Sequence, residues 1–298
     1  MKFRSIAKAG LTLALLLAMV GMLSAAAPIK VGIVNLPPEE SGYRQANVED
    51  MNAVFSSANG YDARQTNTAD NSEQIAAAQG YIRDGVNYLL ISAANASGWD
   101  NVLQSAKKAG VTVFLFDRLI QTAASNYQAA LVSDMATEGK NAVDWLLKNV
   151  KSPNVILIRG QLGSAAELGR SGALLAASKA GKVKIVADGT GGDSWSPDEA
   201  RKVVEAAITS GKVKIIGFDF NRFALRNVQA GYWDFDMQCS PRQATQIAVW
   251  IKDMQAKKKI PSGTVFNKEV GIDTATITDD FIAKQGINDD PGKGVITK

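Results

Sequence analysis

Residues 29–44 read IKVGIVNLPPEESGYR: an almost continuous apolar run, then a polar turn with two prolines, then the start of a helical pattern. Short β-branched runs of this kind are typical of parallel strands that are buried on both faces. Similar runs recur along the chain. The strands that we expect lie at residues 29–35, 86–92, 111–116, 154–159, 182–187 and 213–219.

Longer helical patterns separate these strands, at residues 44–58, 72–84, 97–109, 135–149, 165–180 and 197–210. Glycine follows three of them, at Gly110, Gly181 and Gly211, where the end of a helix favours it. Repeated strand–helix units predict an α/β fold with parallel sheets and right-handed crossovers. The units fall into two blocks with a break near residues 132–134, and a length of 298 residues fits two domains.

The composition excludes several kinds of catalytic centre. The chain has no histidine and one cysteine, Cys239. A Ser-His-Asp triad, a Cys-His pair and an HExxH zinc site are therefore excluded. A single cysteine cannot form an intrachain disulfide, a CxxC motif or a zinc site made of thiolates. We expect no cofactor and no metal.

Residues 1–26 are typical of a secretory signal peptide. Basic residues precede an apolar stretch at 11–23, and small residues at 24–27 offer cleavage sites. The alternative is a retained membrane anchor, but the apolar stretch is shorter than the ~20 residues of a spanning helix. We therefore expect cleavage near residues 25–27 and export of the mature chain.

The net charge of +4 comes mostly from this segment. Lys2, Arg4 and Lys8 lie in it and no acidic residue does, so removing these three from 33 basic residues leaves 30 against 29 acidic ones. A protein that binds nucleic acid should carry a basic excess in its body. The balanced body argues against nucleic-acid binding, a DNA-binding regulator included.

Polar and aromatic side chains collect directly after the expected strands. Asp117 and Arg118 follow one strand, and Trp195 and Asp219 follow two others. Ligands of open α/β sheets bind beyond the carboxyl ends of the strands. Charged groups bind hydroxyls, and an aromatic ring stacks on a sugar. Each residue alone also fits a structural role, but their shared location indicates a polyhydroxylated ligand.

Five segments together resemble the periplasmic sugar-binding proteins of ABC importers, of the ribose/galactose type and especially the galactofuranose-binding proteins. They are ESGYR at 40–44, ISAANASGW at 91–99, FLFDR at 114–118, residues 160–170 and IGFD at 216–219. The resemblance covers the chain from Pro28 onward. It implies an α/β protein of two parallel-sheet lobes (the type I periplasmic-binding-protein fold), joined by three crossings that form a hinge.

The resemblance also implies lobe boundaries and ligand-binding residues. The N-terminal lobe would comprise residues 28–131 plus about 240–272, and the C-terminal lobe residues 132–239 plus about 273–298. The residues that match the family's ligand-binding motifs are Glu40, Tyr43, Arg44, Asp117, Arg118, Arg170, Trp195 and Asp219. Gln238 matches a further position at the hinge, or Cys239 does if the register shifts by one.

The second lobe departs from the family pattern. Residues 207–212 lead directly into the strand at 213, whereas the family has another strand and helix there, opening with an Asn-Asp pair. Roughly thirty residues, the size of one βα unit, are absent. We therefore expect a second lobe one βα unit short, with a four-stranded sheet in place of five strands and a cleft lacking one polar contact.

We interpret the chain as a non-enzymatic periplasmic receptor for a monosaccharide, either a galactofuranose-like hexose or a pentose. As the resemblance implies, it would be a monomer that reaches the membrane only through the permease subunits of an ABC transporter. Two alternatives remain. One is a carbohydrate-active enzyme with Asp117 and Asp219 as paired carboxylates. The other is a sensor that presents the sugar to a membrane receptor or kinase.

Overall fold

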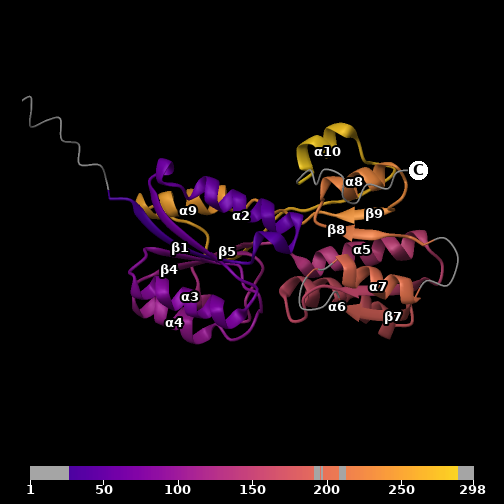
Figure 1. Ribbon diagram of the computed structural model, residues 1–298, viewed down its shortest axis with the longest axis horizontal. Coiled ribbons are helices and arrows are strands. Elements are labelled where there is room, and N and C mark those ends of the chain that lie inside the picture. The colour runs from indigo at the N-terminus through magenta and orange to yellow at the C-terminus, as the bar shows by residue number, and fades with distance from the viewer. Residues whose placement is uncertain (1–26, 191–194, 196, 208–212, 288–298) are drawn as a thin grey trace, which may run out of the picture.

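The chain folds into two α/β lobes that lie side by side (Figure 1). The structure is a computed structural model that describes residues 27–190, 195, 197–207 and 213–287. Within these residues, every helix falls short of the length or the apolar character that a membrane crossing needs. The expected signal peptide and the expected helix end at Gly211 lie outside the described residues.

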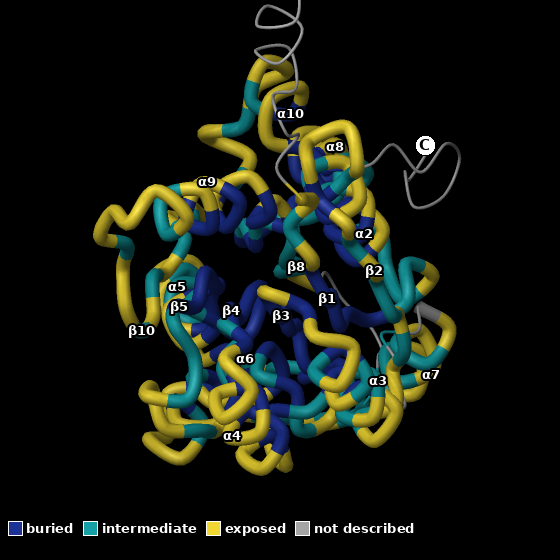
Figure 2. Tube along the Cα trace, turned by 90° about the vertical axis from the view of Figure 1, so that its left-hand side faces the viewer, coloured by how far each residue is buried: buried dark blue, intermediate teal, exposed yellow. Residues whose placement is uncertain are grey.

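The first lobe is built on a six-stranded sheet in which all neighbouring strands are parallel. In spatial order the strands are β10 (Gly263–Phe266), β5 (Ala129–Val132), β4 (Thr112–Asp117), β3 (Tyr88–Ile91), β1 (Ile29–Asn35) and β2 (Tyr61–Asn67). The inner strands β1, β3 and β4 are largely buried, as their apolar sequences predict (Figure 2). β2 is a more polar strand at the edge of the sheet.

Helices cover both faces of this sheet, two on each (Figure 1). The pairs are α2 (Gly42–Val54) with α9 (Ala244–Gln255), and α3 (Asn71–Arg83) with α4 (Asp100–Lys108). The 3-10 turns η1 (Pro38–Glu40), η2 (Ser57–Asn59) and η3 (Ala124–Asn126) lie in its connections. A hydrophobic core lies on each face of the sheet, and alternate residues of β4 point into the two cores. Phe114 and Phe116 pack towards α2 and α9, and Val113 and Leu115 pack towards α3 and α4.

The second lobe has two small sheets instead of one. The strands β6 (Asn154–Arg159) and β7 (Lys184–Thr190) form a parallel pair, and a second sheet has the order β11 (Gly271–Asp273), β9 (Phe235–Met237), β8 (Ile216–Phe218). Its helices are α5 (Met135–Asn149), α6 (Ala165–Lys179), α7 (Pro197–Ala207), α8 (Arg222–Gln229) and α10 (Asp279–Gln285). The prediction of a single four-stranded sheet is therefore wrong, because β6 and β8 do not pair within the described residues.

A cavity of about 230 Å³ lies between β6 and β8 and explains the divided sheet. Its walls are mostly apolar and include Leu146 of α5, Leu157 of β6, Leu174 of α6 and Ile216 of β8. A strand at this place would pair with both edges and fill the space. Only five residues separate the end of α7 from residue 213, too few for a further strand and helix.

Three segments cross between the lobes. The first joins β5 to α5, the second β9 to α9, and the third β10 to β11. α9 and β10 therefore belong to the first lobe, whereas β11 pairs with β9 in the second. The third crossing lies between Phe266 and Gly271, a few residues before the boundary expected near 272.

Candidate functional site

A small pocket lies between the lobes, at the carboxyl ends of their strands. It is lined by Glu40, Ser41, Tyr43, Asp117 and Arg118 from the first lobe and by Met135, Ala166, Arg170, Trp195, Asp219 and Cys239 from the second lobe and the hinge. The larger cavity between β6 and β8 is chiefly apolar, so it offers few of the polar groups that orient a ligand. The interlobe pocket, with its charged and aromatic lining, is therefore the candidate site.

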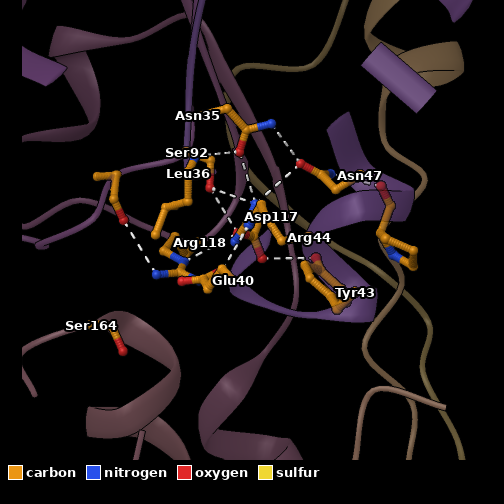
Figure 3. A network of polar contacts seen from close by, with 12 residues as sticks. Asn35, Leu36, Glu40, Tyr43, Arg44, Asn47, Ser92, Asp117, Arg118 and Ser164 are labelled. Carbon is orange, nitrogen blue, oxygen red and sulfur yellow. Dashed lines mark hydrogen bonds and ion pairs between the residues drawn. The ribbon is translucent and has the colours of Figure 1, made fainter. Parts of the chain in front are cut away.

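Asp117 is the centre of a buried polar network in the first lobe (Figure 3). Its Oδ2 accepts hydrogen bonds from Arg44 Nη2 at 2.6 Å and Ser92 Oγ at 2.7 Å, and its Oδ1 accepts one from Tyr43 OH at 2.8 Å. Arg118 Nε donates to the same Oδ2 at 3.1 Å. The carboxylate is thus fixed by four donors at the end of β4.

Arg44 lies behind Asp117, with none of its surface exposed. Its Nε donates to Glu40 Oε2 at 3.1 Å, and its Nη1 donates to the side chains of Asn35 and Asn47. The side chain does not line the pocket. Arg44 therefore positions Asp117, and the structure does not bring it to the place where a ligand contact was expected.

The charges of this network are fixed near neutral pH. Burial alone would raise the pKa of Asp117, but the guanidinium groups of Arg44 and then Arg118 outweigh it and hold the pKa well below its usual range. Burial, followed by the neighbouring Asp117 carboxylate, raises the pKa of Tyr43 well above its usual value. The first lobe thus presents an ionised carboxylate beside a neutral phenol.

Arg170 of α6 organises the second lobe's side of the pocket. Its Nε donates to Glu138 Oε2 at 2.6 Å and its Nη2 to Asp219 Oδ1 at 2.7 Å. The guanidinium also lies over the ring of Phe218, 4.4 Å from the centroid. Burial raises the pKa of Glu138 to about 8 despite its bond to Arg170. Arg170 and Asp219, both expected in the site, are therefore brought together as an ion pair.

The indole of Trp195 lies against the end of β6. A Cβ atom placed on Gly160 would come within 1.9 Å of Trp195 Cζ3, so only a glycine leaves room for the ring. The same ring packs against a buried cluster that includes Tyr43 and Met135. Trp195 therefore lies between the lobes, as expected of a residue that stacks on a ligand.

The two residues considered at the hinge differ in position. Gln238 donates from Nε2 to Gln285 Oε1 of α10 at 3.1 Å and does not line the pocket. Cys239 lines the pocket and is buried. Of the two residues, Cys239 is therefore the one whose side chain reaches the candidate site.

Sequence reasoning missed the uncharged residues that support the network. Ser92 bonds to Asp117, and Asn47 Nδ2 donates to Pro241 O at 2.7 Å and Gln243 Oε1 at 2.8 Å. Ser92 is the last residue of an expected strand, and this position at a carboxyl end could have identified it as a residue of the site. Asn47 lies inside a helix and shows no such signal, because its partners are remote in the sequence.

Comparison with known proteins gives consistent matches. Residues 31–212 match the family model of the periplasmic binding protein domain. The fructose import binding protein FruE of Bifidobacterium longum is 26% identical over 295 residues, which cover 87% of this chain and 86% of that protein. The galactofuranose-binding protein YtfQ of Escherichia coli is 31% identical over 194 residues, 61% of this chain and 58% of that protein.

The fold is also found among solved structures. A galactofuranose binding protein superposes with a TM-score of 0.73 at 22% identity, covering 87% of this chain and 97% of that one. A Mycobacterium smegmatis protein in complex with β-D-fucofuranose superposes with a TM-score of 0.71 at 24% identity, covering 83% and 92%. These likenesses establish the two-lobed α/β fold.

Proposed function

This chain belongs to the family of the periplasmic binding protein domain, and on that premise we propose that it is a non-enzymatic sugar receptor. It holds one monosaccharide, a galactofuranose-like hexose or a pentose, between its lobes and delivers it to the permease of an ABC importer. Relatives named for fructose and galactofuranose support this proposal. The observation that carries it is the interlobe pocket, where carboxylate, guanidinium and aromatic groups converge.

Each lobe supplies an acidic and a basic group to this pocket. Asp117 with Arg118 comes from the first lobe, and Asp219 with Arg170 from the second. The carboxylates accept hydrogen bonds from sugar hydroxyls and the guanidinium groups donate them, which makes both kinds of bond charge-assisted. The indole of Trp195 supplies an apolar surface for the sugar ring. The lining thus suits a ligand with many hydroxyls and no net charge.

Binding requires the lobes to move. The pocket encloses about 50 Å³, which is small against the several hundred Å³ typical of ligand pockets. The lobes therefore separate to admit a sugar and close around it, bending at the three crossings. Because Arg170 and Asp219 already bond to each other, neither charge is left unpaired while the site is empty.

The enzyme alternative has less support. A glycosidase needs one carboxylic acid that is protonated near neutral pH and one ionised carboxylate. Burial favours protonation of Asp117, but Arg44 and Arg118 overcome it and keep its pKa low, so Asp117 could be only the ionised carboxylate. The acid would then have to be Asp219, which is ion-paired with Arg170 at 2.7 Å. A sensor would use the same pocket and differ only in its membrane partner.

The proposal extends to the cellular setting. Residues 1–26 direct export and are removed near residues 25–27, and the mature chain acts as a monomer in the periplasm. Its lobes comprise residues 28–131 plus about 240–270, and 132–239 plus the remainder. Contact with the membrane is made through the permease. Two further relatives, which are named as D-xylose-binding periplasmic proteins, support this location.

A tryptophan-fluorescence titration tests the proposal. The protein is titrated with pentoses and hexoses, furanose forms included, and we expect a saturable change in emission with at least one of them. Trp195→Ala should remove the change, whereas Trp145→Phe, whose ring stacks on Phe235 outside the pocket, should keep it. Analysis of the recovered sugar separates the two classes of function, because chemical conversion of the bound sugar would contradict a receptor.

A further inference from the structure

Three side chains that can bind a metal ion converge where the crossings meet. Glu138 lies in the first turn of α5, just after the first crossing, Cys239 lies in the second crossing, and Glu269 lies in the third. Each offers one ligand atom, and the three atoms lie within 4.8 Å of one another. The pocket residues alone do not account for this cluster, because Glu138 and Glu269 do not line the pocket.

One oxygen of this cluster is buried without a hydrogen-bond partner. Glu138 is 1% exposed, and its Oε1 has no partner, although its Oε2 accepts from Arg170. Cys239 is 2% exposed. A buried oxygen without a donor is costly, and such groups in native structures call for an explanation such as an ion. The orphaned oxygen therefore points to a missing positive partner.

We propose that Glu138, Cys239 and Glu269 form a binding site for a divalent thiophilic cation, with Zn²⁺ as the best fit. Calcium and magnesium prefer sites made only of oxygen, whereas a thiolate with two carboxylates suits zinc. Three protein ligands leave one position of a tetrahedral ion open for water. The inference concerns the hinge alone and does not depend on the binding of a sugar.

The local charges favour a cation. Three acidic side chains, Glu138, Glu269 and Asp219, and one basic side chain, Arg170, face the Cys239 sulfur. Arg170 is already paired with both Glu138 and Asp219. The acidic side chains outnumber the basic one, so the cluster suits a cation whose binding displaces protons from its ligands.

Neighbouring groups hold two of the ligands in place. Glu269 Oε1 accepts hydrogen bonds from Ser133 Oγ at 2.6 Å and from Ser240 N at 2.7 Å, and the Cys239 thiol donates to Ser133 Oγ at 3.2 Å. Such supporting bonds are typical of metal ligands. Tetrahedral bond lengths of 2.0–2.3 Å place ligand atoms roughly 3.5 Å apart, and the three atoms here lie within 4.8 Å of one another. Cys239 lines the interlobe pocket, which gives an ion its route of entry.

A bound ion would tie together the three segments that bend when the lobes move. Each ligand comes from or beside a different crossing, so opening of the lobes would strain the coordination. The cation would therefore stiffen the hinge.

Cobalt substitution tests the site in the full mature chain, purified without a histidine tag. The chain has no histidine and a single cysteine, so a thiolate-to-cobalt absorption band can arise only from Cys239. We expect one Co²⁺ per chain with this band, displacement of Co²⁺ by Zn²⁺, and loss of the band in Cys239→Ser. Glu269→Gln should bind Zn²⁺ at least about tenfold more weakly.

Asp280→Asn is the matched control, because it removes an exposed carboxylate of α10 and should leave Zn²⁺ affinity unchanged. If a variant fails to fold, the cobalt spectrum of the unmodified chain still shows whether Cys239 binds the ion. Absence of the thiolate band, or Zn²⁺ binding that Cys239→Ser and Glu269→Gln leave unaltered, would overturn the proposal.

Discussion

Asp117 and Asp219 hold corresponding positions in the two lobes, each at the carboxyl end of a strand with a left-handed backbone conformation. The angle φ is +66° at Asp117 and +87° at Asp219. Asp117 bonds to Arg44 at 2.6 Å, and Asp219 bonds to Arg170 at 2.7 Å. A left-handed conformation costs a residue with a Cβ atom on the order of 1–2 kcal/mol. Both strained positions line the interlobe pocket, where strain coincides with the proposed ligand contacts.

Replacement of Asp117 by asparagine should destabilise the fold strongly. Asp117→Asn leaves the fully buried guanidinium of Arg44 without its main counter-charge, and breaking a buried pair in this way costs about 3–5 kcal/mol. Urea unfolding measures the loss. Asp84→Asn is the control, because the Asp84–Arg64 pair is more than half exposed and should be worth less than about 1 kcal/mol. Equal effects of the two changes would contradict the assigned role of Asp117.

The contribution of Asp117 to stability should depend on pH. Burial raises its pKa, but Arg44 and Arg118 lower it more, so the folded value lies below the ~3.9 of an unfolded chain. Such a carboxylate stabilises the fold fully above the unfolded pKa and progressively less as pH falls toward the folded pKa. The gap in unfolding free energy between wild type and Asp117→Asn should stay constant from about pH 7 to 5 and shrink below about pH 4. If the difference in unfolding free energy instead grows as the pH falls, the pKa of Asp117 is not lowered in the folded state.

A methyl group at Gly160 should displace Trp195. Gly160→Ala places its Cβ within 1.9 Å of the indole, so the ring must leave its place and sugar affinity should fall. Gly172→Ala in α6 is the control, since a Cβ there meets nothing within 4 Å and should stabilise the helix by about 0.5–1 kcal/mol. Tryptophan emission and sugar titration of both variants provide the measurement. Unchanged emission and affinity in Gly160→Ala would show that Trp195 is not held at this place.

The second lobe should unfold before the first. Among the described residues its two sheets do not pair, and an apolar cavity of about 230 Å³ lies between them, whereas six strands and two cores support the first lobe. We expect two transitions in a thermal melt, with early proteolytic cleavage confined to residues after Ser133. One unfolding transition, with the same midpoint by every spectroscopic probe and with early cleavage in both lobes, would contradict this expectation.

Where the sequence alone locates structure, the reason is local. The expected strands at 29–35 and 154–159 and the helix at 135–149 coincide with β1, β6 and α5 at both ends. The two strands are short β-branched runs, and Asp134 caps α5 by accepting from Thr137 N. β2 was missed because it is a polar edge strand, whose sequence does not carry the apolar pattern of a buried one.

The features that the sequence did not reveal depend on contacts between remote segments. Arg44 belongs to a matching motif, but only the packing of α2 against β4 turns it away from the pocket and into a network. The choice between Gln238 and Cys239 depends on the register of one hinge segment. The gap between β6 and β8 likewise follows from how the shortened lobe packs, which no local pattern encodes.

The cluster at the hinge shows the same limit. Because the chain has a single cysteine, a zinc site made only of thiolates is excluded. The carboxylates of Glu138 and Glu269 join Cys239 only because three crossings meet at one place. A mixed set of ligands drawn from three distant segments leaves no spacing motif in the sequence.

Calorimetric titration of the mature chain with a panel of pentoses and hexoses is the decisive test of the proposed sugar receptor. We predict saturable binding of one sugar per chain, recovered chemically unchanged. Asp219→Asn should weaken binding by roughly tenfold, about 1.4 kcal/mol, while the exposed control Asp144→Asn should not. If a chain that is shown to be folded gives no binding heat with any sugar in the panel, the proposed function is wrong.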